Sequence, residues 1–242
     1  MYLAEIWRYP VKSMAGESLA EAEISSLGIA GDRQVQVYNA NELVVTARTH
    51  PRLLGHHGTL DHKGEPLVDG RHWTDPSVLA DVRRIVGPEA QLSREEDPGL
   101  RFDILPLLVA TDGAIAEFGR DRRRLRPNLV IGGVQGLDER SWPGEELRIG
   151  EVVITVHALR KRCVMTTFDP DTLVQDHEVL RDIVRRFDAH LALDCAVARG
   201  GRVQVGQSVE LLPAQTPLPL SHTPGSGIPR TRPRSRTEGR TK

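Results

Sequence analysis

Apolar and polar residues alternate over short stretches in the first hundred positions, which is the pattern of strands that bury one face. The predicted strands are 2–8, 33–38, 42–46, 53–60 and 66–68. Glycine, asparagine, aspartate and proline separate these stretches and indicate turns. Short strands with closely spaced turn signals predict a β-sandwich or a β-barrel.

The period changes at residues 75–87, where apolar side chains recur every three or four positions and predict a helix. Asp75 can cap this helix, and Pro76 suits its first position. Beyond residue 100 the pattern is mixed. Strands are predicted at 107–110 and 128–131, helices from Thr111 or Asp112 to 118 and at 178–187, and hairpins at 146–149 with 152–156 and at 191–198 with 202–212.

These patterns together predict a β-rich α+β fold in two parts. Residues 1–100 form a barrel-like part, and residues 101–212 form a second β-barrel part that bears a few helices. Residues 213–242 are rich in Pro, Ser, Thr, Gly and Arg and lack the apolar side chains that offset ordering entropy, so we predict a disordered tail. Its six basic residues against one acid would allow it to dock an acidic redox protein.

Composition narrows the class of protein. The 242 residues are 39% hydrophobic, which is enough for a sizeable core. A net charge of −1 gives no case for a nucleic-acid partner, and two cysteines do not make a disulfide framework. The start lacks the features of a secretory signal, and no apolar run approaches the roughly 20 residues of a membrane span. We therefore expect a cytoplasmic protein without a membrane association.

Cys163 is a candidate metal ligand, because three cations at 160–162 precede it and positive neighbours favour the thiolate form. A thiolate is a soft metal ligand. The alternative is that Cys163 is a small buried hydrophobic residue, as most free cysteines are. Cys195 lies in an apolar stretch beside an acid, which favours a buried structural role. The zinc-type spacings C-x-x-C and H-E-x-x-H are absent.

Two basic clusters indicate an anion site. Lys12 and Ser13, just past the first strand, could hold a phosphate by charge and hydrogen bonding. A run of arginines at 120–126 is interpreted mainly as a solvated loop, with Arg126 as the candidate for an inward anion contact. The residues alone therefore predict a site that combines an anion-binding cluster with a thiolate.

Several motifs occur in one order along the chain. They are Tyr-Pro-Val-Lys-Ser at 9–13, Gly-Asp-Arg at 31–33, Thr-Ala-Arg at 46–48, Pro-Arg-Leu at 51–53, Arg-Pro-Asn at 126–128, Arg-Cys at 162–163, Thr-Thr at 166–167 and Asp-Pro-Asp at 169–171. This set resembles the MOSC family, named for the C-terminal domain of molybdenum cofactor sulfurase. It is most similar to the two-part members, the mitochondrial amidoxime-reducing components and their bacterial relatives, over most of residues 1–212.

The resemblance implies a single molybdenum-pterin cofactor between the two parts. Cys163 would supply a thiolate to molybdenum. The implied cofactor-binding residues are Lys12, Ser13, Arg33, Arg126, Asn128 and Arg162. The implied reaction is the two-electron reduction of a small N-hydroxylated compound, with Asp103 as a nearby proton donor or positioning group. The fused ferredoxin of some relatives, with C-x4-C-x2-C spacing, is missing, so a separate electron donor such as a ferredoxin or flavin reductase is implied.

Some positions depart from the family. Ile104 and Leu105 replace two hydroxyl residues that could bind phosphate, Lys161 replaces a small polar residue, and Asp194 stands where Asn or Tyr is frequent. Two alternatives to a reductase therefore stay open. One is a carrier of sulfurated molybdenum cofactor, and the other is a fold that has lost the cofactor. The pyridoxal-phosphate domain of a complete sulfurase is larger than the remaining chain, so that association is with the family only.

Overall fold

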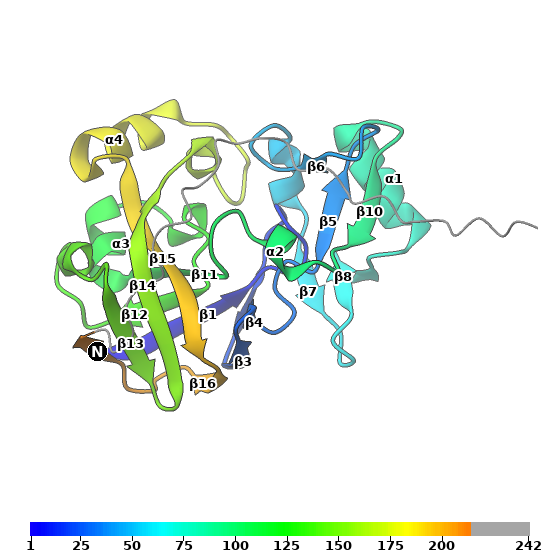
Figure 1. The fold of residues 1–242 in the computed structure, drawn as a ribbon. Helices are drawn as coiled ribbons and strands as arrows, with labels where there is room; N and C mark the ends of the chain where they lie inside the picture. The colour runs from blue at the N-terminus through cyan, green and yellow to red at the C-terminus, as the bar shows by residue number, and fades with distance from the viewer. Residues whose placement is uncertain (214–242) are drawn as a thin grey trace, which may run out of the picture.

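The computed structural model describes residues 1–213, and within them most of the strands join one large sheet (Figure 1). The eight strands of this sheet, in spatial order, are β17 (Glu210–Pro213), β13 (Glu145–Ile149), β14 (Val152–Lys161), β15 (His190–Arg199), β11 (Leu107–Thr111), β12 (Leu129–Gly132), β1 (Tyr2–Arg8) and β2 (Glu17–Leu19). The first strand of the chain therefore lies within the same sheet as the last.

Three smaller sheets carry the remaining strands of the described residues. They are β10 (Gln91–Arg94), β5 (Val35–Tyr38) and β6 (Val44–Val45); β16 (Gly201–Gln204), β3 (Glu21–Ser25) and β4 (Gly28–Ile29); and β7 (Gly58–Leu60), β8 (Pro66–Val68) and β9 (Arg71–His72). Helix α1 (Pro76–Val86) lies beside β5 and β10 at one side of the molecule, whereas α3 (Asp112–Phe118) and α4 (His177–Phe187) lie at the large-sheet side (Figure 1). The short helix α2 (Pro98–Arg101) lies between the two sides (Figure 1).

Strand β1 is the main link between early and late parts of the sequence. It pairs antiparallel with β12, and a bulge shifts the register between Leu3 and Glu5. A bulge changes which residues face the core, and the two fully buried side chains of β1 are accordingly Leu3 and Ile6, three positions apart. Both belong to the main core cluster, together with residues from β11 to β15.

Capping residues mark the ends of the helices. The Asp75 carboxylate accepts a hydrogen bond from Ser77 N, and Pro76 is the first residue of α1, as predicted. Thr111 Oγ1 accepts from Ala114 N at the start of α3, which ends at Gly119 with a positive φ of 64°. Helix α1 buries Val78 and Val82 against the sheet of β5 and β10, which forms a second core cluster.

The prediction of a β-rich α+β fold is confirmed, but two predicted elements are wrong. Residues 53–60 are not one strand, because Pro51–Gly55 forms a 3-10 helix (η1) that buries Leu53 and Leu54, and only Gly58–Leu60 is extended. The predicted hairpin of 191–198 with 202–212 is also wrong. Strand β15 pairs with β14 and β11, β16 pairs with β3, and β17 pairs with β13.

The sequence pattern did not predict the short strands β2, β3, β4, β9 and β10 or helix α2. The boundary at residue 100 stays a prediction. Pro213, assigned to the tail, is the last residue of β17, and the rest of the predicted disordered tail, 214–242, lies outside the described residues. Across the described chain, each helix is too short or too polar to cross a bilayer.

Candidate functional site

Cys163 stands at the turn that follows the long strand β14, directly before the 3-10 helix η4 (Val164–Thr167). Its carbonyl oxygen accepts hydrogen bonds from Thr166 N at 3.1 Å and Thr166 Oγ1 at 2.9 Å, which close the turn. The Cys163 side chain is half-buried, whereas Cys195 is fully buried in β15. Burial raises the pKa of the Cys195 thiol, as expected for a structural cysteine. The two cysteines thus have the different environments that the sequence predicted.

The Cys163 loop, residues 162–176, packs against the N-terminal part of the chain. Phe168 of the loop is buried in a small cluster with Ala47 and Leu54. The Ala47 amide in turn donates a 3.0 Å hydrogen bond to Ser13 Oγ. Ser13 therefore positions the Thr-Ala-Arg motif against the Cys163 loop, which is a role that the spacing of these residues in the sequence does not show.

Asp103 is the centre of a cluster of cations. Lys12 Nζ lies 3.1 Å from Asp103 Oδ1, Arg48 Nη2 forms an ion pair with Asp103 Oδ2, and Arg160 Nη2 lies 4.0 Å from it. Burial would raise the pKa of Asp103, but Lys12 and Arg48 lower it far below its usual range. Asp103 is therefore ionised at neutral pH, which suits a positioning group better than a proton donor.

Arg48 connects this cluster to Cys163. Burial lowers the pKa of Arg48, but the Asp103 carboxylate and the neighbouring Cys163 side chain raise the pKa above the ordinary value. Sequence reasoning quoted Arg48 only as part of a motif and missed it as a site residue. Arg160, also missed, donates to Asp194 Oδ1 at 2.7 Å and so pairs with one of the positions that depart from the family.

Arg126 and Arg162 differ from Lys12, Arg33, Arg48 and Arg160 because neither forms an ion pair within 4.0 Å among residues 1–213. The Arg126 guanidinium carbon lies 4.3 Å from the centroid of the Tyr9 ring, and burial lowers the pKa of Arg126 to about 10. Arg162 Nη2 donates to Leu125 O at 2.8 Å, while its Nε is buried without a hydrogen-bond partner in the described structure. Burial also lowers the pKa of Arg162 to about 10. Partial burial of a positive charge that forms no ion pair is costly, and an anion would offset that cost.

Arg33 lies over the Tyr9 ring and is hydrogen-bonded to Asn128. Arg33 Nη1 pairs with Asp32 and donates to Asn128 Oδ1 at 3.3 Å, and its guanidinium carbon lies 5.3 Å from the Tyr9 centroid. Asn128 also accepts from Leu108 N, and its amide donates to Trp7 O and Asp32 Oδ2. Since an amide side chain has two donors and two acceptor lone pairs, Asn128 is saturated by protein contacts. It positions Arg33 and joins β1 to β11.

Three of the predicted residues have strained backbone conformations. Ser13, Arg33 and Arg126 have φ angles of 70°, 51° and 57°, in the left-handed region that residues other than glycine rarely adopt. Such strain persists only where surrounding contacts over-determine it, and it clusters at functional sites. The three conformations are compatible with a binding role for these residues.

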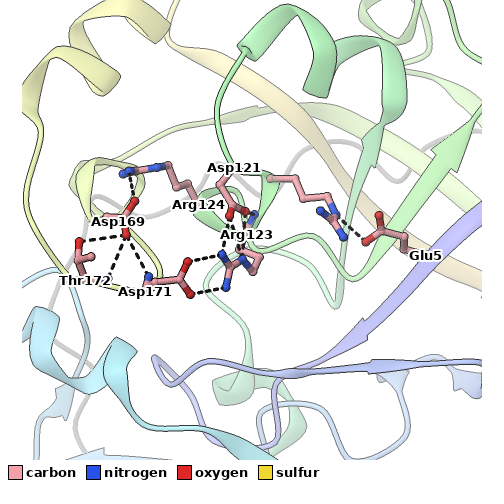
Figure 2. A network of polar contacts seen from close by, with 8 residues as sticks. Glu5, Asp121, Arg123, Arg124, Asp169, Asp171 and Thr172 are labelled. Atoms are coloured by element: carbon pink, nitrogen blue, oxygen red, sulfur yellow. Dashed lines mark hydrogen bonds and ion pairs between the residues drawn. The ribbon is translucent and has the colours of Figure 1, made fainter.

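The prediction of a solvated arginine loop is wrong for the 3-10 helix η2 (Arg122–Arg124), whose side chains are held by acids from distant segments (Figure 2). Arg122 Nε donates to Glu5 Oε2 at 2.7 Å, Arg123 makes two bonds to Asp171 at 2.8 and 2.7 Å, and Arg124 Nη2 donates to Asp169 Oδ2 at 2.9 Å. The acids lie far away in the sequence, so no local signal could have identified these pairs.

The structure brings all eight predicted site residues into one region. Ion pairs and a side-chain contact connect Lys12, Asp103 and Arg48 to Cys163, and Tyr9 lies beside both Arg33 and Arg126. In residues 1–213, His, Cys, Asp and Glu side chains form no cluster of three or more that would hold a metal ion alone. The arrangement suits one soft metal ligand, Cys163, beside a buried anion-binding surface.

Comparison with known proteins identifies two domain families in this chain. Residues 112–210 match the MOSC domain, and residues 1–72 match the MOSC N-terminal beta barrel domain. Mitochondrial amidoxime reducing component 2 of Macaca fascicularis is 27% identical over 76% of this chain and 72% of its own length. Mitochondrial amidoxime-reducing component 1 of Homo sapiens is 27% identical over 73% of this chain and 68% of its own length. The solved YUAD protein from Bacillus subtilis is 12% identical, with a TM-score of 0.49 over 88% of this chain and 96% of its own.

Proposed function

Because this chain is a member of the MOSC family that also has the N-terminal beta barrel domain, we propose that it binds a molybdenum-pterin cofactor and reduces N-hydroxylated compounds. The names of its relatives, amidoxime reducing components, support this reaction class. The observation that carries the proposal is a half-buried Cys163 in the same region as Arg126 and Arg162, two half-buried cations that form no ion pair within 4.0 Å in the described chain.

The residues present fit such a cofactor. The orphaned Nε of Arg162 and the guanidinium of Arg126 offer donors and positive charge for a phosphate. Arg33, beside Tyr9, would add a further cation to hold the cofactor, and Lys12 would add a cation near Asp103. Cys163 would hold molybdenum through its thiolate. When bound, the cofactor supplies the two-electron redox chemistry.

The replacement of two hydroxyl residues by Ile104 and Leu105 is compatible with this proposal. The Ile104 side chain is half exposed and offers no hydrogen bond, so this position does not contribute to phosphate binding. Arg126 and Arg162 lie on a different segment and are independent of this change. We therefore assign phosphate binding mainly to the arginines rather than to hydroxyl groups.

Asp103 has a positioning role in this proposal. Its carboxylate holds Lys12 at 3.1 Å and pairs with Arg48, which lies beside Cys163. Since these cations keep Asp103 ionised, it accepts hydrogen bonds at neutral pH and does not release a proton. The two protons that accompany reduction and release of water must therefore come from another group or from solvent.

Electrons would come from a separate redox protein, and the substrate would be a small molecule that reaches the half-buried thiol. A ferredoxin or a flavin reductase is a suitable class of donor, since this chain has only two cysteines and cannot hold a four-cysteine cluster. We place the protein in the cytoplasm, and this assignment rests on the sequence features described above.

The test is molybdenum content by elemental analysis of protein from a host that makes the cofactor, with wild type beside Cys163→Ala. We expect near-stoichiometric molybdenum in the wild type and loss of the metal in the variant. Turnover of an amidoxime with a reduced dye then separates the reductase from a carrier, which would bind the cofactor and not turn over. Absence of molybdenum from the wild type would overturn the proposal.

A further inference from the structure

The three arginines of η2 point in three directions from one turn. A 3-10 helix has three residues per turn, so consecutive side chains are about 120° apart. Arg122 pairs with Glu5 on β1, Arg123 with Asp121 and the exposed Asp171, and Arg124 with Asp169 (Figure 2). The turn therefore anchors several segments that are distant in the sequence.

Arg124 is the most enclosed of the three, with a side chain that is 10% exposed against 39% for both Arg122 and Arg123. It makes two contacts with the Cys163 loop. Arg124 Nη2 donates to Asp169 Oδ2 at 2.9 Å, and Nη1 donates to Thr166 O at 3.3 Å. Thr166 donates through its amide and its hydroxyl to Cys163 O, so Arg124 is two contacts away from the Cys163 backbone.

Asp169 is a fixed partner for Arg124. Its other oxygen, Oδ1, accepts from Asp171 N at 3.1 Å and from Thr172 N and Oγ1 at 3.0 Å (Figure 2). The carboxylate is therefore held by its own loop on one side and by Arg124 on the other. A fixed acceptor loses little freedom on pairing, which favours a defined geometry over a loose surface contact.

The same turn also connects to Arg126 and Arg162, the two arginines to which we assign phosphate binding. Arg126 N donates to Arg123 O at 3.2 Å, and Leu125 O accepts from Arg162 Nη2 at 2.8 Å. Residues 122–126 thus contact the Cys163 loop through Arg124 and carry Arg126 at their end. Residues that hydrogen-bond to the segment carrying a metal ligand, without touching the metal themselves, orient that ligand.

We propose that Arg124 is a positioning residue that sets the place of the Cys163 thiol relative to Arg126 and Arg162. This inference rests on the proposed cofactor site for its functional meaning, but the geometry exists in the cofactor-free chain. Loss of Arg124 would release the 166–169 segment from η2 and allow the Cys163 turn to open. The thiol would become more accessible, and a metal bound to it would be held less firmly.

The test compares Arg124→Gln with Arg122→Gln, a matched control on the same turn whose partner Glu5 lies on β1 and away from the loop. The first readout is the rate at which iodoacetamide alkylates Cys163 in cofactor-free protein, followed by peptide mass spectrometry, with the buried Cys195 as an internal reference. The second is the rate of molybdenum loss from the cofactor-loaded protein. Removal of a residue that orients a metal ligand weakens metal binding by roughly 10- to 100-fold.

We expect Arg124→Gln to speed both alkylation of Cys163 and loss of molybdenum, and Arg122→Gln to match the wild type. Arg124→Lys, which keeps a cation for Asp169 and loses the second donor, serves if the glutamine variant does not fold, and should give an intermediate alkylation rate. Alkylation rates equal to wild type in both Arg124 variants would overturn the inference. If no protein holds molybdenum, the proposed function fails, while the alkylation comparison still decides the role of Arg124.

Discussion

Replacement of Arg126 by methionine should stabilise the cofactor-free chain and at the same time impair the site. Burial lowers the pKa of Arg126 from 12.5 to about 10, and 1.36 kcal/mol per pKa unit makes the cost of its charge about 3 kcal/mol. The stacking on Tyr9, at 4.3 Å, returns about 1 kcal/mol of this cost. Methionine keeps much of the packing and removes the charge, so the net gain is about 1–2 kcal/mol.

The sign of the pH dependence follows from the lowered pKa. Both folded and unfolded chains have a charged Arg126 below about pH 10, so the destabilisation is complete at neutral pH. Between about pH 10 and the ordinary value of 12.5 the unfolded chain binds more protons, so this contribution to stability improves as pH rises. The stabilising effect of Arg126→Met is therefore expected in full at pH 7.

The assay is thermal unfolding of cofactor-free protein at pH 7 and low salt. A gain of 1–2 kcal/mol corresponds to a rise in Tm of roughly 2–8 °C for a domain of this size. The control is Arg181→Met on the exposed face of α4, where the side chain is 69% exposed and a change within about 0.5 kcal/mol is expected. Added phosphate should raise the Tm of wild type more than that of Arg126→Met. A Tm for Arg126→Met below that of wild type would refute the view of Arg126 as an uncompensated charge.

Two further predictions concern other residues of the candidate site. Asp103→Asn should make the stability of the fold less sensitive to acid. The lowered pKa of Asp103 stabilises the wild-type fold above about pH 4, and this stability is lost as pH falls through the folded pKa. The free energies of unfolding of wild type and variant, measured along an acid titration, should therefore converge at low pH. An equal pH dependence of the free energy of unfolding in the two proteins would contradict the stabilising contacts of Asp103 with Lys12 and Arg48. Asn128→Leu leaves Leu108 N and Trp7 O without their side-chain partners. The free energy of unfolding, measured with urea, should fall by about 2–5 kcal/mol. A fall of less than about 1 kcal/mol would show that the hydrogen bonds of Asn128 are not satisfied by the protein.

Much of the candidate site could be proposed from the sequence because its residues occur in short motifs, and its role in binding a cofactor stays a prediction. Lys12, Ser13, Arg126 and Cys163 stood out by charge and position, and Arg33 followed from the resemblance.

The remaining site contacts could not be predicted because they join distant segments. Arg48 meets Asp103 across 55 positions, and Arg122 meets Glu5 across 117. A run of arginines has the same local pattern whether it is solvated or paired, so only the fold distinguishes the two states. The hydroxyl of Ser13 likewise supports a loop 34 residues away, although its type suggested a phosphate contact.

The fold shows the same division between local and distant information. Capping residues marked the ends of α1 and α3 correctly. Hairpins were assigned by proximity in the sequence, and β15 instead pairs with strands that precede it by longer intervals. The apolar pair Leu53 and Leu54 was interpreted as part of a strand, but Pro51 and the following turn place both side chains in the core from a 3-10 helix.

The position of β1 between β12 and β2 bears on how the chain matures during synthesis. Residues 2–8 are synthesised long before their antiparallel partner, which spans residues 129–132. Until that partner is made, β1 has an unsatisfied edge and the exposed apolar side chains of Leu3 and Ile6, a combination that promotes association between chains. Separate production of either half would leave the same edges open permanently, so the two halves should be soluble only when they are co-expressed.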